Sequence, residues 1–225
     1  MKDYKSLEEK IGYQFQDINL LDTALTHRSY ANERKINTCE NYERYEFLGD
    51  AVLEFVVSEY LYENYEKLKE GELSKLRASL VCEFTLSKIA RELGYGEYAK
   101  FGKGEKKTGG CNRDSILCDL FEAVLGAIYL DGGMEEARGY VNRFLLTDIE
   151  KKQKFYDAKT RLQEYTQAHG KKLEYRLVGE EGPDHDKQFL VDALIDDVVM
   201  ASAKGHNKKQ AEQMAAYDVL NQLMQ

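Results

Sequence analysis

The chain has 225 residues, of which 43% are hydrophobic and 32% charged, a composition typical of folded globular domains and not of disordered chains. Its net charge is −8, which excludes the uniformly basic surface that many nucleic-acid-binding proteins carry. No apolar run approaches the roughly 20 residues of a membrane-spanning helix, and the N-terminal segment has no apolar signal core.

The cysteines give no sign of a zinc site or of a disulfide framework. Cys39, Cys82, Cys111 and Cys118 form no CxxC pair, and no histidine lies at zinc-site spacing from them. We therefore expect reduced thiols, a cytoplasmic location, and no association with a membrane.

The first ~150 residues show the apolar periodicity of helices. Glycine clusters at 94–96, 102–110 and 132–133 separate these segments. A polar, charged stretch at 151–157 is predicted to be a linker. The predicted helical segments are 20–25, 47–61, 73–93, 116–130 and 140–149.

The pattern changes after the linker. A helix is predicted at 157–169, and a last helix at 208–223 with Asn207 as its N-cap. Between them, residues alternate at the period of strands, and Asp196 and Asp197 form a tight turn. The α-β-β-β-α order favours a three-stranded sheet with both helices on one face. The predicted strands are 173–180, 187–195 and 197–204.

The most informative segment is NYERYEFLGDAVLEFVVSEYLY, residues 41–62. The rest of its helical circumference is apolar, which predicts a buried helix. Buried carboxylates are costly unless they are paired or bound to a metal. At ~100° per residue, one narrow stripe of this helix holds Glu43, Glu46, Asp50 and Glu54.

A second apolar segment, SILCDLFEAVLGAIYLDGG at 115–133, repeats the pattern. Asp119 and Glu122 are its only charges before Asp131, and they share one face of the helix. Two such helices indicate that their acids converge. Clustered carboxylates without histidine or thiolate suit a hard cation, Mg²⁺ or Mn²⁺. Two other interpretations are open: a solvated acidic face, and a di-iron carboxylate bundle, which uses Glu-x-x-His pairs that these segments lack.

The sequence ERYEFLGDAVLEF at 43–55 resembles the signature of the ribonuclease III family. Residues 157–225 resemble a double-stranded-RNA-binding domain. The resemblance implies an all-α catalytic domain at 3–133, with a closing helix and linker to about 155, followed by an α+β RNA-binding domain at 157–225. Further segments that fit the family are LTHRSY at 25–30, EGELSKLRASLV at 70–81, and residues 102–133.

The resemblance also implies roles for particular residues. The metal ligands would be Glu46, Asp50, Asp119 and Glu122. Asp50 and Glu122 match the two residues usually called catalytic, Glu43 an acid near the RNA backbone, and Glu70 one that supports the site. In the second domain, the residues that would contact RNA are Gln163, Glu164, His185, Lys204, Lys208 and Lys209.

The implied activity is metal-assisted hydrolysis of double-stranded RNA by a homodimer that uses no small-molecule cofactor. Products would have 5′-phosphate and 3′-hydroxyl ends with short 3′ overhangs, and substrates would be ribosomal, messenger and transfer RNA precursors. A different class remains open, a non-catalytic double-stranded-RNA-binding protein whose helical domain only dimerises. A metal-storage bundle without RNA affinity is the third.

Overall fold

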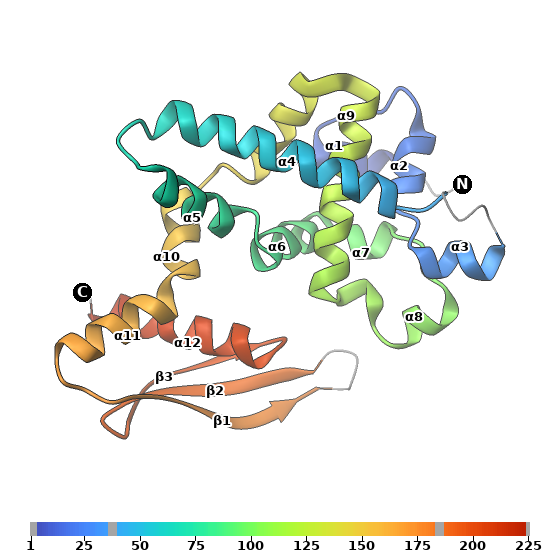
Figure 1. The fold of residues 1–225 in the computed structure, drawn as a ribbon. Coiled ribbons are helices and arrows are strands. Elements are labelled where there is room, and N and C mark those ends of the chain that lie inside the picture. Colours follow the sequence, from blue (N-terminus) through green and yellow to red (C-terminus); the bar gives the residue numbers. More distant parts are fainter. Residues whose placement is uncertain (1–3, 36–39, 183–186, 224–225) are drawn as a thin grey trace. The chain divides into compact units, whose positions relative to one another are not determined.

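The computed structural model describes residues 4–35, 40–182 and 187–223. The chain divides into two compact units, Met1–Ile149 and Glu150–Gln225. The first is helical and the second combines a small sheet with helices (Figure 1). This is the predicted fold class. Among the described residues, no helix combines the length and apolar character needed to cross a membrane.

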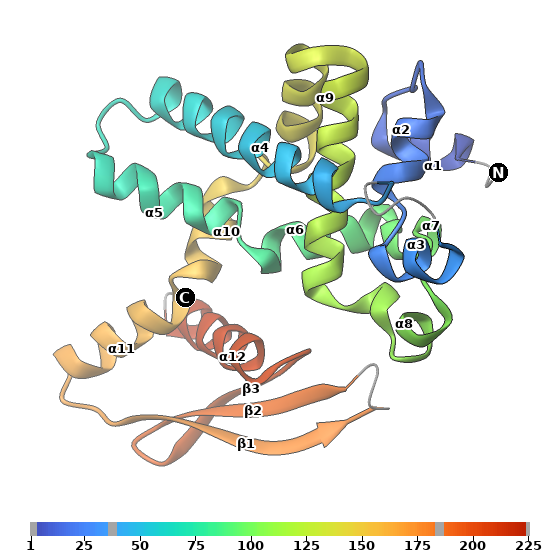
Figure 2. The ribbon, with the colours of Figure 1, turned by 45° about the vertical axis from the view of Figure 1, so that its right-hand side comes forward.

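The first unit is organised around one long apolar helix, α9, which crosses α4 (Figure 2). Leu120, Phe121 and Val124 of α9 are fully buried at the centre of the core. The elements of this unit are α1 (Lys5–Ile11), α2 (Ile18–Ala24), α3 (Arg28–Arg34), α4 (Glu43–Asn64), α5 (Glu70–Leu80), α6 (Glu83–Leu93), α7 (Tyr95–Tyr98), α8 (Lys103–Lys107), the 3₁₀ turn η1 (Gly110–Asn112) and α9 (Asp114–Phe144).

Two glycines allow α4 and α9 to pack backbone against backbone. A Cβ atom on Gly49 of α4 would lie 1.8 Å from the carbonyl oxygen of Glu122. A Cβ atom on Gly126 of α9 would lie 2.3 Å from the carbonyl oxygen of Tyr45. No side chain fits at either position, so these glycines set the close approach of the two acid-bearing helices.

The predicted helical segments differ from the structure at two places. The segment 73–93 is two helices, because the chain leaves the helix at Val81 and restarts after Cys82. The segment predicted at 140–149 leaves the helix after Phe144, and a new helix starts at Ile149. The predicted break at 132–133 is confirmed, because α9 joins two helices across a kink at Gly133, which has φ 82° and ψ −173°. Such a backbone suits glycine, and the second of the two helices ends at Phe144.

One face of α4 is exposed although the sequence predicts a buried helix. Phe47 is 81% exposed, Phe55 51% and Tyr62 77%. The opposite face packs into the core through Val52, Val56 and other buried residues. The prediction of a helix buried on all its apolar sides is therefore wrong for this face of the single chain.

The second unit has the predicted α-β-β-β-α order. Its sheet is antiparallel in the order β1-β2-β3, and α11 and α12 cover one face (Figure 1). Asp196 and Asp197 both have positive φ in the turn between β2 and β3, as in a tight hairpin. Asn207 caps α12, its side chain accepting a hydrogen bond from the Gln210 amide. The elements are α10 (Ile149–Tyr156), α11 (Ala158–Ala168), β1 (Leu173–Glu181), β2 (Gln188–Ile195), β3 (Val198–Gly205) and α12 (Lys208–Leu223).

The segment predicted as a linker forms helix α10 instead. Phe155 at its end packs against Tyr217 of α12, with ring centroids 5.7 Å apart. Gln213 of α12 donates hydrogen bonds to the carbonyl oxygens of Phe155 and Tyr156. These contacts order residues that the polar sequence pattern alone presents as irregular.

Candidate metal centre

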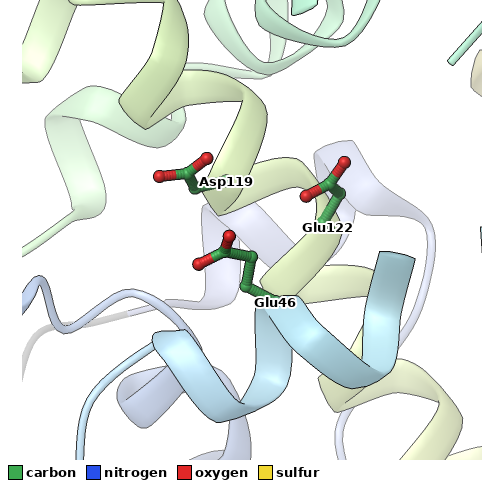
Figure 3. A group of neighbouring side chains, drawn as sticks. All are labelled: Glu46, Asp119 and Glu122. Atoms are coloured by element: carbon green, nitrogen blue, oxygen red, sulfur yellow. The ribbon is translucent and has the colours of Figure 1, made fainter. Parts of the chain in front are cut away.

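Three carboxylates from α4 and α9 converge, as the two acidic stripes predict. Glu46 comes from α4, and Asp119 and Glu122 come from α9 (Figure 3). Each offers an oxygen atom, and these oxygens all lie within 4.8 Å of one another. All three side chains are half-buried, so water only partly screens their mutual repulsion.

The pKa values of these carboxyl groups reflect that repulsion. Burial and the neighbouring charge of Asp119 raise the pKa of Glu46 to about 7. Burial and the charges of Asp50 and Asp119 raise the pKa of Glu122 to about 8. Burial also raises the pKa of Asp119, against a hydrogen bond from Tyr42 that lowers it. The metal-free cluster therefore holds protons at neutral pH.

Asp50 lies beside the cluster without belonging to it. Its negative charge raises the pKa of both Glu46 and Glu122, which places it in their electrostatic neighbourhood. Its side chain is exposed, one turn beyond Glu46 on α4. The structure thus brings together three of the four predicted metal ligands and leaves Asp50 at their edge.

The two ends of the α4 stripe have cationic partners. Glu43 lies 3.4 Å from a guanidinium nitrogen of Arg28, and Glu54 lies 2.8 Å from one of Arg77. Glu46 has no such ion pair in the described part of the chain; only the more distant charge of Arg28 lowers its pKa. Oxygen donors with raised pKa values and little nearby positive charge fit a hard divalent cation.

Glu70 is not brought to the cluster within one chain. It begins α5, and its carboxylate accepts a hydrogen bond from Ser74. Between Glu46 and Glu70 the chain runs the remaining length of α4, which ends at Asn64 (Figure 1). Its supporting role stays a prediction.

Two described residues that contact the cluster had no role predicted from the sequence. Tyr42 donates a hydrogen bond from its hydroxyl to Oδ2 of Asp119, 3.1 Å away. The thiol of Cys118, one turn before Glu122 on α9, lies 3.9 Å from Oε1 of Glu122. Tyrosine and cysteine side chains occur in protein cores as readily as in functional sites. The one sequence signal for a role was therefore that each of these residues directly precedes an acid of the two stripes.

The predicted RNA-contacting residues lie on the surface of the second unit. Gln163 and Glu164 are exposed on α11, and Lys208 and Lys209 are exposed in the first turn of α12. At this end of a helix, free N–H groups and the helix dipole favour anions. Lys204 on β3 forms an ion pair with Glu181, and His185 lies outside the described residues.

Comparison with known proteins assigns both units. Residues 17–149 match the family model described as Ribonuclease-III-like, and residues 158–223 match the double-stranded RNA binding motif. The chain is 48% identical to Ribonuclease 3 of Caldanaerobacter subterraneus subsp. tengcongensis, covering 96% of each chain. It is 46% identical to Ribonuclease 3 of Streptococcus uberis, covering 99% of each.

A solved structure agrees with the first unit. The nuclease domain of ribonuclease III from Campylobacter jejuni is 44% identical, with a TM-score of 0.59, over 67% of this chain and 98% of that one. The fold, the acidic cluster and these matches define a nuclease domain joined to a double-stranded-RNA-binding domain. The chain belongs to the ribonuclease III family and is an endoribonuclease for double-stranded RNA.

Divalent-metal binding to this protein is expected to weaken as the pH falls from about 9 to about 6, because cation and proton compete for the same oxygens. Glu46, with a pKa of about 7, and Glu122, with one of about 8, must lose protons to bind an ion. The dissociation constant for Mn²⁺, measured by calorimetry without RNA, should rise as the pH falls. The rise should be about tenfold per pH unit for each proton that metal binding displaces. A constant independent of pH would contradict the raised pKa values.

Proposed function

We propose that this ribonuclease hydrolyses the phosphodiester backbone at the carboxylate cluster, leaving 5′-phosphate and 3′-hydroxyl ends with short 3′ overhangs. The observation that carries the proposal is the convergence of Glu46, Asp119 and Glu122 from two helices that pack against each other in the core. So compact a group of acids is stabilised by a cation, and in a chain that also carries an RNA-binding domain the target of that cation would be a phosphodiester.

Glu46, Asp50, Asp119 and Glu122 are the proposed ligands of Mg²⁺, with Mn²⁺ as a substitute. When bound, the ion would lower the pKa of a water molecule and offset the negative charge that develops on the phosphoryl group. Asp50 and Glu122 have the catalytic role in this proposal. Asp50, the most exposed of the four, would complete the ligand set from the solvent side.

Glu43 is proposed to lie near the RNA backbone and Glu70 to support the site. Glu43 fits a position at the edge of the centre, because it is exposed and its charge is offset by Arg28. Glu70 has no contact with the cluster that supports the role, which rests on the family resemblance alone.

The second domain is proposed to hold duplex RNA by its shape. A-form RNA presents 2′-hydroxyls in a wide, shallow minor groove. Gln163 and Glu164 would meet one minor groove and His185 the next. Lys208 and Lys209 would bind the phosphates that lie between these two minor grooves. Lys204 would also bind phosphate once its ion pair with Glu181 opens.

The protein is also proposed to act as a homodimer through α4. Phe47, Phe55 and Tyr62 form an exposed aromatic row that a single chain leaves in water. The Campylobacter jejuni structure is described as having a region involved in dimer formation. Pairing through this row would leave each cluster of Glu46, Asp119 and Glu122 in its own subunit.

A long RNA duplex incubated with the protein and Mg²⁺ should be converted to short duplexes. End-labelling should find 5′-phosphates and 3′-hydroxyls on the products, and chelation of the metal should stop the reaction while the protein still retards the duplex in a gel. Retardation without cleavage under Mg²⁺ and Mn²⁺ would favour a non-catalytic RNA-binding protein.

The natural substrates proposed are ribosomal, messenger and transfer RNA precursors, in the cytoplasm. The reduced thiols expected there agree with the free cysteines of the described residues, Cys82, Cys111 and Cys118.

A further inference from the structure

Tyr42 links the two helices that supply the carboxylates. It is the residue directly before α4, so it lies one turn before Glu46. Its hydroxyl donates a hydrogen bond to Oδ2 of Asp119 on α9, at 3.1 Å. The side chain is only 4% exposed, so water does not compete freely for this hydrogen bond.

The ring of Tyr42 is held from behind. It stacks on His27, with centroids 5.3 Å apart and planes 24° from parallel, and His27 in turn packs against Phe101. The backbone amide of Tyr42 donates to the carbonyl oxygen of Thr26 at 2.9 Å. The imidazole of His27 is fixed by the amide of Ser29, which donates to Nδ1. The hydroxyl therefore has a defined position from which to act.

The Asp119 carboxylate needs such a partner. Its neighbours Glu46 and Glu122 are both acidic, and their repulsion favours a rotamer that turns Asp119 away from the cluster. A donor on one oxygen leaves the other free toward Glu46 and Glu122. Hydrogen-bond partners of metal ligands characteristically orient them in this way.

We infer that Tyr42 is a positioning residue of the metal centre, which holds Asp119 in the orientation that binds the divalent ion. The inference rests on the proposed metal centre. It assigns Tyr42 no contact with the ion or with RNA. Tyr42 acts through Asp119, so losing its hydroxyl should weaken metal binding more than it slows the chemical step.

Tyr42→Phe tests this, because it removes the hydroxyl and keeps the ring stacked on His27. We expect the dissociation constant for Mn²⁺, measured by calorimetry on the full chain without RNA, to rise about tenfold. At saturating Mn²⁺, kcat for duplex RNA should stay within about threefold of wild type, while the metal concentration giving half-maximal rate rises in parallel with the dissociation constant.

Tyr95→Phe is the matched control. Tyr95 is fully buried in the same unit, and its hydroxyl lies 2.5 Å from that of Tyr140. Its loss should lower thermal stability and leave Mn²⁺ affinity unchanged.

Three results would overturn the inference. Unchanged Mn²⁺ affinity of Tyr42→Phe is the first. An equal loss of affinity in Tyr95→Phe is the second, because the effect would then be general. The third is a Tyr42→Phe chain that does not fold, since the hydroxyl would then serve the fold and not the site. Wild-type protein that binds no Mn²⁺ would instead reject the proposed centre itself, and the inference with it.

Discussion

Replacing Glu122 by glutamine is expected to reduce the cleavage of duplex RNA severely and to stabilise the metal-free protein at the same time. Glutamine keeps the size of the side chain and removes the negative charge that holds the cation. Cleavage should fall by about a hundredfold to a thousandfold, the range seen when one group that stabilises the transition state is lost. Binding of the duplex should persist, because the second domain is untouched.

The stability effect follows from the raised pKa of Glu122. With a pKa of about 8 in the fold and 4.5 as the reference value, the folded state binds more protons than the unfolded state between these limits. The free energy of unfolding of the wild type therefore falls as the pH rises from about 4.5 to about 8. At pH 8 and above, the free energy of unfolding of Glu122→Gln should exceed that of the wild type by roughly 1–2 kcal/mol after allowance for solvent screening. Its unfolding temperature should be a few degrees higher.

Glu92→Gln provides the comparison. Glu92 is an exposed glutamate of α6, outside the described cluster, so its replacement should leave both cleavage and stability unchanged. A Glu122→Gln protein that cuts at the wild-type rate would remove Glu122 from the site. One that loses stability would show that the carboxylates of the metal-free cluster do not repel one another.

Gly49→Ala is expected to destabilise the protein strongly and to disrupt the metal centre. The new Cβ would lie 1.8 Å from the carbonyl oxygen of Glu122 and 3.0 Å from the amide nitrogen of Gly126. Both are backbone atoms, so α4 and α9 must separate. We expect a loss of about 3 kcal/mol or more in the free energy of unfolding, the upper range for overpacking. Denaturant unfolding measures it.

The same separation moves Glu46 away from Glu122, because the clash is at the Glu122 backbone itself. The fraction of Gly49→Ala protein that still folds should bind Mn²⁺ weakly. Gly71→Ala is the control, since Gly71 lies in α5 with nothing within 4 Å of the added atom. It should be neutral or stabilising by roughly 0.5–1 kcal/mol. A Gly49→Ala protein with wild-type stability would contradict the close backbone contact between α4 and α9.

The sequence was most informative where charge contradicts its surroundings. Glu46, Asp119 and Glu122 stand in apolar helices at spacings that put them on one face of each, and this sufficed to predict that they meet. The α-β-β-β-α unit was predictable for a similar reason, since strand periodicity and the Asp196–Asp197 turn are local signals.

What the sequence could not give depends on contacts between distant segments. Glu54 shares the stripe with Glu46, but its position on α4 places it against Arg77 of α5, so it is an ion-pair partner. Phe47 is exposed in the single chain, but its apolar side chain predicts burial. The sequence cannot distinguish the two cases, because interfaces and cores select the same side chains. Tyr42 gains its role from where α4 and α9 cross.

The decisive measurement is diffraction from crystals soaked in Mn²⁺, recorded at a wavelength where manganese scatters anomalously, because it shows where the ion binds. We expect an anomalous peak enclosed by the carboxylates of Glu46, Asp119 and Glu122, with Asp50 turned toward it. A crystal that holds manganese elsewhere, with no peak among these oxygens, would contradict it.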